Sequence, residues 1–587
     1  MIILNRKDPK YEILGNNGHC TAFASMHTYS RLNNSTQSLL TPCSSPDFRS
    51  TMASNTPAQN TTPSDASKNV VHNVNVIGKD RHLSQSSCTP TLIEDGRAVL
   101  TEQGNLHLTA YKWSTRKKWI LLTVVALCQI SMNFNAAIYS NAVEAINEDF
   151  GVTNARMGMV AFLVPYAFGC ELWAPWSEEL GRWIIMQLSL AGVNVSILIC
   201  ALSPSFGGVI AGRVIGGLSS AGGSVTLGMV ADMFDTDSQQ HAVLWASLWS
   251  CLGAVLGGIC GGPIQQFLHW RWNFWIQLMF SGVTAAVHFF VAKESRATIM
   301  LDQEAKRRRN VGEELYGPNE IRTFKKRFNA KEIAKTMWRP YQMLMFEPIV
   351  LFLSLLSGFA DALIFSFFES YSIIFAQYSF TPVQTSLALI PLAASYWLAY
   401  FSFFPVVARH THRRKQGETL SPESRLCWLL FHVILLPLGL LGSAFVATTH
   451  WAGVLAFSVL IGMANYSIYF ATVDYMVAAY GPFSASATGG NGFARDFLAG
   501  MCALYTGKMY KNLGVRNSQL LLFGLAAVFC VPIYVFYKFG PAIRKRSRFA
   551  MKLANDKRSA RNTAAAAEPQ PCERQGNAHE IAEATRA

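Results

Sequence analysis

Charged side chains occur inside stretches of this sequence that are otherwise apolar. A charged group is costly to place in the interior of a bilayer, so each one needs an oppositely charged partner, a water-filled cavity or a function. These charged residues are Glu171, Arg213, Asp361, Glu369, Arg495 and Asp496. Asp361 and Glu369 are eight positions apart, which places them on roughly one face of a helix.

The carboxylates among these residues are candidates for proton chemistry. Burial favours the neutral form of a carboxyl group, so such a residue can take up and release a proton as its surroundings change. We assign proton coupling to Glu171, Asp361, Glu369 and Asp496, with Glu171 and Asp361 first among them. Arg213 and Arg495 are permanent charges and suit structural ion pairs between helices, which is also the alternative role for the carboxylates.

Neutral polar and aromatic side chains also interrupt the apolar stretches. They can form hydrogen bonds between helices, line a cavity, or stack on an aromatic or cationic ligand. The residues that we assign to a substrate cavity are Asn133, Asn135, Tyr139, Phe365, Phe368, Tyr371, Asn465, Tyr466 and Asn491. Plain packing is the alternative for the aromatic members.

The elements that must position these residues are long apolar helices. About twelve runs have the roughly 20 apolar residues that span a bilayer. They are 119–142, 157–176, 184–203, 207–229, 242–263, 273–292, 348–375, 382–406, 425–447, 453–477, 485–507 and 518–538. The pattern predicts an all-α membrane protein with twelve transmembrane helices in two six-helix halves. Two such halves are typical of transporters whose substrate site lies between them.

Basic residues set the expected topology and domains. They flank the apolar runs, as at Arg116–Lys118 and Arg544–Arg548, and an even number of spans then places both termini in the cytosol. The expected segments are a disordered cytosolic tail (1–117), the N-terminal half (118–292), a basic cytosolic linker (293–346), the C-terminal half (347–540) and a cytosolic tail (541–587). We expect a multi-pass protein of the cell membrane, with the vacuolar membrane as the alternative.

Composition excludes several classes of protein. Only 15% of the 587 residues are charged, against about 25% in soluble proteins. The net charge is +14, but the basic residues flank the apolar runs and are not gathered on one domain. This distribution argues against a nucleic-acid partner. The 12 cysteines lack a paired CxxC, so we expect no metal site. The sequence has no phosphate loop or nucleophile elbow, so we expect neither an enzyme nor a cofactor.

Several motifs resemble those of the major facilitator superfamily. Residues 174–182 resemble the loop signature between its second and third spans, with Glu178, Gly181 and Arg182 matching. Arg213 resembles the buried arginine of the fourth-span signature, and Asp232 matches the end of that span. The resemblance assigns Glu178 and Arg182 to a latch on the inner side, and with Arg213, Asp232 and Arg495 they form our structural set.

Other segments narrow the resemblance to the fungal twelve-span drug:proton antiporter branch, which includes polyamine and multidrug exporters. Gly253 to Gly262 resembles the antiporter signature, although Gly258 replaces its proline. Asn133 and Asn135 occupy the region of the acid that the family carries in its first span. The proton assignment therefore moves to Glu171 and Asp361.

The resemblance implies a monomeric, proton-driven secondary transporter. Its partners are the lipid bilayer, protons and a small-molecule substrate. It would export amphipathic or cationic molecules such as drugs, toxins, secondary metabolites or polyamines by alternating access. The alternatives are a nutrient importer or facilitator on the same fold, and a membrane sensor that no longer transports.

Overall fold

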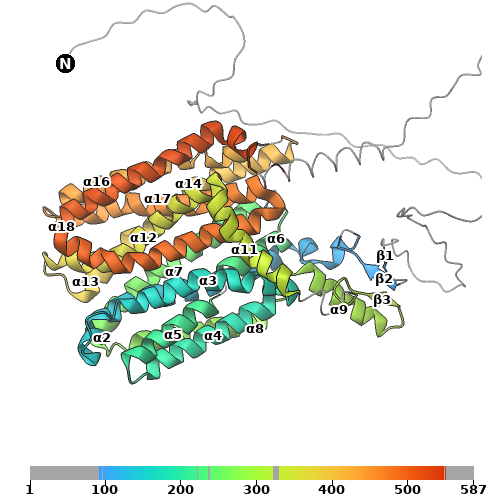
Figure 1. Cartoon of the computed structure of the whole chain (residues 1–587), viewed down its shortest axis with the longest axis horizontal. Helices are drawn as coiled ribbons and strands as arrows, with labels where there is room; N and C mark the ends of the chain where they lie inside the picture. Colours follow the sequence, from blue (N-terminus) through green and yellow to red (C-terminus); the bar gives the residue numbers. More distant parts are fainter. Residues whose placement is uncertain are drawn as a thin grey trace, which may run out of the picture. The chain divides into compact units, whose positions relative to one another are not determined.

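The computed structural model describes residues 91–94, 97–102, 104–220, 222–235, 238–321, 329–418, 420–547, 549 and 551. Most of both predicted tails and the basic cluster at 325–327 lie outside these residues. The described part is nearly all helical and confirms the predicted fold class (Figure 1). Ten of its helical segments are long and apolar enough to cross a membrane.

The N-terminal half contains the helices that match the first six predicted spans and one short helix between the first two spans. They are α1 (Thr115–Ile138), α2 (Val143–Phe150), α3 (Met157–Glu179), α4 (Arg182–Leu202), α5 (Phe206–Ser219), α6 (Gly222–Met233), α7 (Gln239–Phe267) and α8 (Trp272–Val291). The fourth predicted span is divided into α5 and α6 at Ser220, which has φ −78° and ψ 113°. Glycine and serine dominate this stretch and are poor helix formers, which accounts for the break.

The C-terminal half matches the remaining six spans. Its helices are α12 (Pro348–Ala376), α13 (Pro382–Leu387), α14 (Ile390–Lys415), α15 (Leu429–His432), α16 (Leu435–Val446), α17 (Trp451–Tyr480) and α18 (Ser484–Arg544). The last two predicted spans are both in α18. Gly514, at φ 74° and ψ 168°, reverses the chain between them in a conformation that favours glycine.

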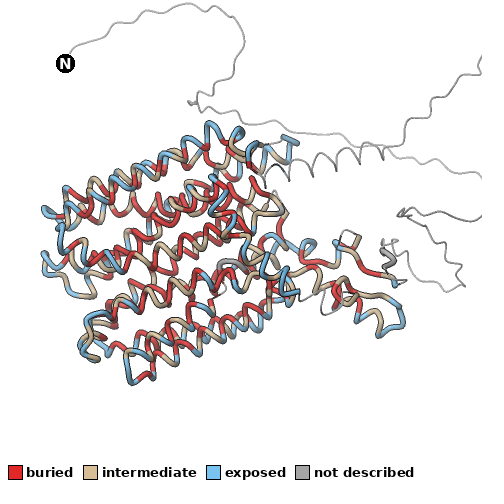
Figure 2. The backbone as a smooth tube through the Cα atoms, in the orientation of Figure 1, coloured by how far each residue is buried: buried red, intermediate tan, exposed pale blue. Residues whose placement is uncertain are grey.

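The two halves lie side by side, and each packs mainly within itself (Figure 1). Between the halves, α3 packs against α18, and α7 packs against α13, α14 and α17. Buried residues concentrate where helices face one another (Figure 2). Large apolar side chains such as Val195, Val283, Phe290 and Val528 are exposed, as expected for a surface that faces lipid.

We call the end of the bundle that carries Arg182, Gln240 and Arg544 the basic end. Arg544 and Gln240 line one cavity there, although they come from different halves. The other end, which carries α2 and α13, is the opposite end (Figure 1).

A small ordered unit precedes α1, where the sequence predicts disorder. Strand β1 (Thr91–Glu94) pairs antiparallel with β2 (Arg97–Leu100), and β2 pairs in parallel with β3 (Leu315–Tyr316) of the linker. Leu100 is buried against Leu301 of α9 (Ala297–Arg309). The disorder prediction therefore fails for residues 97–117, because these short strands gain their partner from the distant linker. The linker also contains α11 (Ala330–Phe346).

Candidate functional site

Arg182 forms the centre of a buried cluster at the basic end of the N-terminal half. Its Nε donates to Asp232 Oδ2 at 3.0 Å, and its Nη1 donates to Ser177 Oγ at 2.5 Å. Arg296 of the linker approaches the other oxygen of Asp232 at 3.4 Å. Arg182 therefore ties the end of α3 and the start of α4 to the end of α6.

The expected latch partner of Arg182 is corrected by this geometry. Glu178 is exposed and makes no ion pair with any residue that the structure describes. Asp232 takes its place, because α6 brings that carboxylate into the buried space beside the guanidinium.

Glu294 is a part of this cluster that the sequence reasoning missed. Its carboxylate accepts from the backbone N–H groups of Arg182 at 2.9 Å and Trp183 at 3.1 Å, which begin α4. The N-terminus of a helix favours a negative charge. Gly181 has φ 108°, and a Cβ there would lie 3.0 Å from the Cδ of Glu294. The Gly-Arg pair of the sequence motif is therefore the docking site of a linker carboxylate.

Arg213 is buried without a carboxylate partner among the described residues. Its Nη1 donates to the backbone oxygen of Asn135 at 2.9 Å and to Asn135 Oδ1 at 3.1 Å, and its Nε donates to Gly158 O at 3.1 Å. The guanidinium lies 4.2 Å from the ring centroid of Phe162 and 4.7 Å from that of Tyr139. The prediction of an ion pair for Arg213 is wrong, because carbonyl oxygens and aromatic faces solvate the charge instead.

This arrangement also places two residues that were assigned to the substrate cavity. Asn135 is held by Arg213, and the hydroxyl of Tyr139 donates to the backbone oxygen of Ala155 at 2.8 Å. Both are fully buried inside the N-terminal half. Asn135 thus connects α1 to α5, Tyr139 connects the end of α1 to the loop before α3, and neither lines the cavity between the halves that is described below.

Arg495 lies between two carboxylates in the C-terminal half. Its Nη2 is 3.0 Å from Asp496 Oδ1, and its Nε is 3.8 Å from Asp361 Oδ2 on α12. The guanidinium also lies 4.5 Å from the ring centroid of Tyr469 on α17. With both carboxylates ionised, this cluster would carry one more negative than positive charge, so uptake of one proton would neutralise it.

Glu171 lies apart from the other predicted carboxylates. It is 3% exposed and makes no hydrogen bond or ion pair with the residues that the structure describes. A Cβ at Gly489 of α18 would lie 3.0 Å from its Cδ, so Glu171 is at the contact between the two halves. Aromatic rings of Phe168, Tyr341 and Phe493 cluster one turn away, with Phe168 and Phe493 centroids 5.0 Å apart.

A second buried network joins the halves at the basic end. Arg425 hydrogen-bonds to the carboxylate of Asp474, which also accepts from Gln240 Nε2 at 2.6 Å. Gln240 belongs to the N-terminal half, and its Oε1 accepts from Arg414 at 2.9 Å. Asp474 is only 1% exposed and is part of this network.

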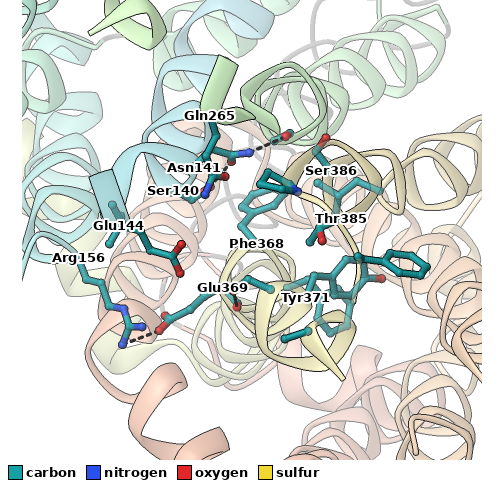
Figure 3. A pocket seen from close by; sticks show the side chains of 18 of the residues that line it. Ser140, Asn141, Glu144, Arg156, Gln265, Phe368, Glu369, Tyr371, Thr385 and Ser386 are labelled. Atoms are coloured by element: carbon teal, nitrogen blue, oxygen red, sulfur yellow. Dashed lines mark hydrogen bonds and ion pairs between the residues drawn. The ribbon is translucent and has the colours of Figure 1, made fainter. Parts of the chain in front are cut away.

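A cavity of about 290 Å³ lies between the halves at the opposite end (Figure 3). Phe368, Tyr371 and Glu369 from the predicted residues line it. Glu369 Oε1 is 2.8 Å from Nη1 of Arg156, which sequence reasoning did not select. Glu369 therefore contacts other residues than the Arg495 cluster does, although Asp361 of that cluster is on the same helix.

The other residues assigned to the cavity make contacts between helices. Tyr396 donates to Asn465 Oδ1 at 3.1 Å, Tyr466 donates to Leu244 O at 2.8 Å, and Asn491 donates to Ser354 Oγ at 3.4 Å. Asn133 donates to Ser250 Oγ of α7 at 3.4 Å and to Gln129 O of its own helix at 3.0 Å, whereas the ring of Phe365 lies 5.5 Å from that of Phe368 on the same helix. Their role towards a substrate stays a prediction.

Several known proteins are similar to this chain in sequence. A family model described as Major Facilitator Superfamily matches residues 125–504. The chain is 29% identical to the transporter paaT of Penicillium rubens, over 75% of this chain and 81% of that protein. It is 28% identical to a multidrug transporter, TPO1_2, of Candida glabrata, over 79% and 82% of the two chains. It is 27% identical to the transporter kojT of Aspergillus flavus, over 75% and 80%.

Proposed function

Because the chain belongs to the Major Facilitator Superfamily, we propose that it exports small amphipathic or cationic molecules in exchange for protons. Relatives named as multidrug transporters support the choice of substrate class. The basic residues at one end of the bundle support a cytosolic location for that end and for both termini, in the cell membrane. The opposite end then faces outward.

One observation carries the proton part of the proposal. Inside the helix bundle, Asp361 and Asp496 share the single guanidinium of Arg495, while Glu171 has no cationic partner among the described residues. An unpaired carboxylate in a dry interior is stabilised by taking up a proton. A proton can therefore bind from one side of the membrane to Glu171 at the contact between the halves, or to Asp361 in the core. The same proton can then leave to the other side.

The contacts of Glu171 support a link between protonation and conformation. Alternating access requires α3 and α18 to separate at the basic end. Protonation removes the charge of Glu171 and changes the energy of its contact with Gly489, which would couple protonation to the position of α3 relative to α18. Protonation from outside would bias the inward-facing state, from which the proton is released to the cytosol.

The experiment measures rhodamine 6G efflux, driven by a pH gradient, from cells that express the protein or its variants. We expect Glu171→Gln and Asp361→Asn to lower this efflux at least tenfold while the protein remains in the membrane. The matched control is Glu178→Gln, which changes an exposed carboxylate of the same helix and leaves efflux unchanged. Full efflux in both test variants would refute the proton assignment, and uptake in place of efflux would point to an importer.

A further inference from the structure

We propose that Arg156 and Glu369 form a gate at the opposite end, and that a cationic substrate opens it by replacing Arg156 on Glu369. The inference rests on the proposed transport function and narrows its substrate class to cations. Neither the motifs nor the named relatives assign a role to Arg156.

The ion pair joins the two halves. Arg156 immediately precedes α3 in the N-terminal half, and Glu369 is on α12 in the C-terminal half. Their side chains, 38% and 11% exposed, meet at 2.8 Å (Figure 3). Among the described residues, it is the one ion pair that connects the halves.

The ion pair lies where three helices meet, and the packing there leaves space for both side chains. Gly507 of α18 lies beside it, and a Cβ there would be 2.8 Å from Arg156 Cζ and would also collide with Glu369 Oε1. The neighbouring contacts between halves are neutral. Val383 N donates to Gln266 Oε1 at 3.2 Å, and Gly258 faces the ring of Phe368. Arg156 and Glu369 therefore form the ion pair of this closure, and Glu144 and Lys511 are further charged groups close to it.

The cavity beside the pair has the chemistry of a cation site. Glu144 lines it and makes no ion pair with any described residue. Figure 3 shows the Glu144 carboxylate on the same side of the cavity as Glu369, with the rings of Phe368 and Tyr371 across from them. Carboxylates and aromatic faces together attract an organic cation.

A cationic substrate can compete with Arg156 for Glu369 because both carry a positive charge. Removing Arg156 from Glu369 leaves a largely buried carboxylate without its partner, which is unfavourable. A cation that arrives in the cavity replaces the lost partner, whereas a neutral molecule or an anion does not. The gate therefore opens for the class of molecule that the cavity attracts.

The first experiment measures closure by cysteine alkylation and needs no transport. Ser386 lines the cavity and is 3% exposed. Ser386→Cys is introduced with Cys260→Ser, because Cys260 is an exposed cysteine of α7. A membrane-impermeant maleimide is then added from the outer side. We expect slow alkylation, and at least tenfold faster alkylation after Arg156→Gln.

A charge exchange and a control complete this test. Arg156→Glu combined with Glu369→Arg should restore slow alkylation, because the pair is re-formed with its charges reversed. Lys508→Gln removes an exposed positive charge of α18 without altering the pair, and should leave the rate slow. An unchanged rate in Arg156→Gln would overturn the gate, as would a charge exchange that fails to restore closure.

The second experiment tests the substrate class with the same readout. Tetraphenylphosphonium should accelerate alkylation at least threefold, and its anionic isostere tetraphenylborate should not. The acceleration should vanish in Glu369→Gln. Equal effects of the two probes, or none from either, would refute opening by cations. Cation-dependent alkylation without any flux would instead contradict the proposed function and leave the gate standing.

Discussion

Single residues at the basic end illustrate how a buried charge is held. Asp232 forms ion pairs with Arg182 and Arg296. Glu294 accepts hydrogen bonds from the first backbone N–H groups of α4. Each of these carboxylates is satisfied by groups from a different segment of chain. The cluster therefore holds the N-terminal half and the linker in one arrangement.

Asp232→Asn should destabilise the protein by about 3 kcal/mol, because it leaves the buried Arg182 without its counter-charge. Glu178→Gln is the matched control, since Glu178 belongs to the same sequence motif but is exposed. Thermal unfolding of both variants in lipid nanodiscs measures the difference. Equal loss of stability in the two variants would contradict the assignment of Asp232 as the partner of Arg182.

The presence of charged residues within the spans was predictable, and their partners largely were not. A charged residue within an apolar run is directly visible in the sequence. Its partner depends on helix rotation and on segments far away, as with Arg213 and the carbonyl oxygens of α1 and α3. Arg156 was overlooked because it lies in a polar loop, where an arginine is unremarkable without knowledge of Glu369.

At the scale of elements, the close approach of α7 and α13 closes the opposite end. A Cβ at Gly262 would lie 2.7 Å from the backbone oxygen of Pro382 and would overlap Ser386. Two glycines of the predicted antiporter signature, Gly258 and Gly262, therefore allow the two halves to touch. Sequence spacing identified these glycines, but not the helix that they contact.

Gly262→Leu should keep the opposite end from closing, because the new side chain must push α13 away from α7. The readout is alkylation from the outer side of a cysteine that replaces Thr385, another residue of the cavity, and we expect it to become at least fivefold faster. Gly282→Leu is the control, since a Cβ at Gly282 of α8 meets no atom within 4 Å. Similar rates for the two variants would argue against glycine-dependent closure.

The strand pairing between β2 and β3 is an element that sequence patterns could not predict. Each strand is too short to show alternation, and the pairing connects residues separated by more than 200 positions. Arg309 supports β3 through two hydrogen bonds of 2.8 Å to Glu320. The membrane spans, by contrast, were predictable because each is long and mostly apolar.

Arg309→Gln should expose the β3 segment, in a manner that depends on pH. The hydrogen-bonded Arg309 guanidinium lowers the pKa of Glu320 below its ordinary value of 4.5. Its stabilising contribution is therefore present above that value and is lost as pH falls through the lower folded-state pKa. Hydrogen exchange of residues 315–320, corrected for intrinsic rates, should differ between wild type and variant at pH 7. A difference that persists after Glu320 is protonated would contradict this account.

At the scale of the whole molecule, the two halves touch at both ends. Gln240 and Asp474 meet at the basic end, and Arg156 and Glu369 meet at the opposite end. Breaking one set of contacts while keeping the other would give access from one side at a time. The two-half architecture was predictable from the spans, whereas this closed arrangement depends on contacts between side chains.

The proposed topology places both termini in the cytosol. An epitope tag inserted after Arg544 should bind antibody only in permeabilised cells, because the basic end faces inward. A tag between α12 and α13, near Ser379, should bind in intact cells. Labelling of both tags in intact cells would contradict the orientation.

The central claim is that substrate and protons move in exchange, and proton movement measures it directly. Purified protein is reconstituted into liposomes that are acidic inside and contain the pH-sensitive dye pyranine. Adding rhodamine 6G outside should make the interior of wild-type vesicles more alkaline as protons leave, and vesicles with Glu171→Gln and Asp361→Asn combined should not respond. Entry of rhodamine 6G through the protein without any change in internal pH would contradict the account.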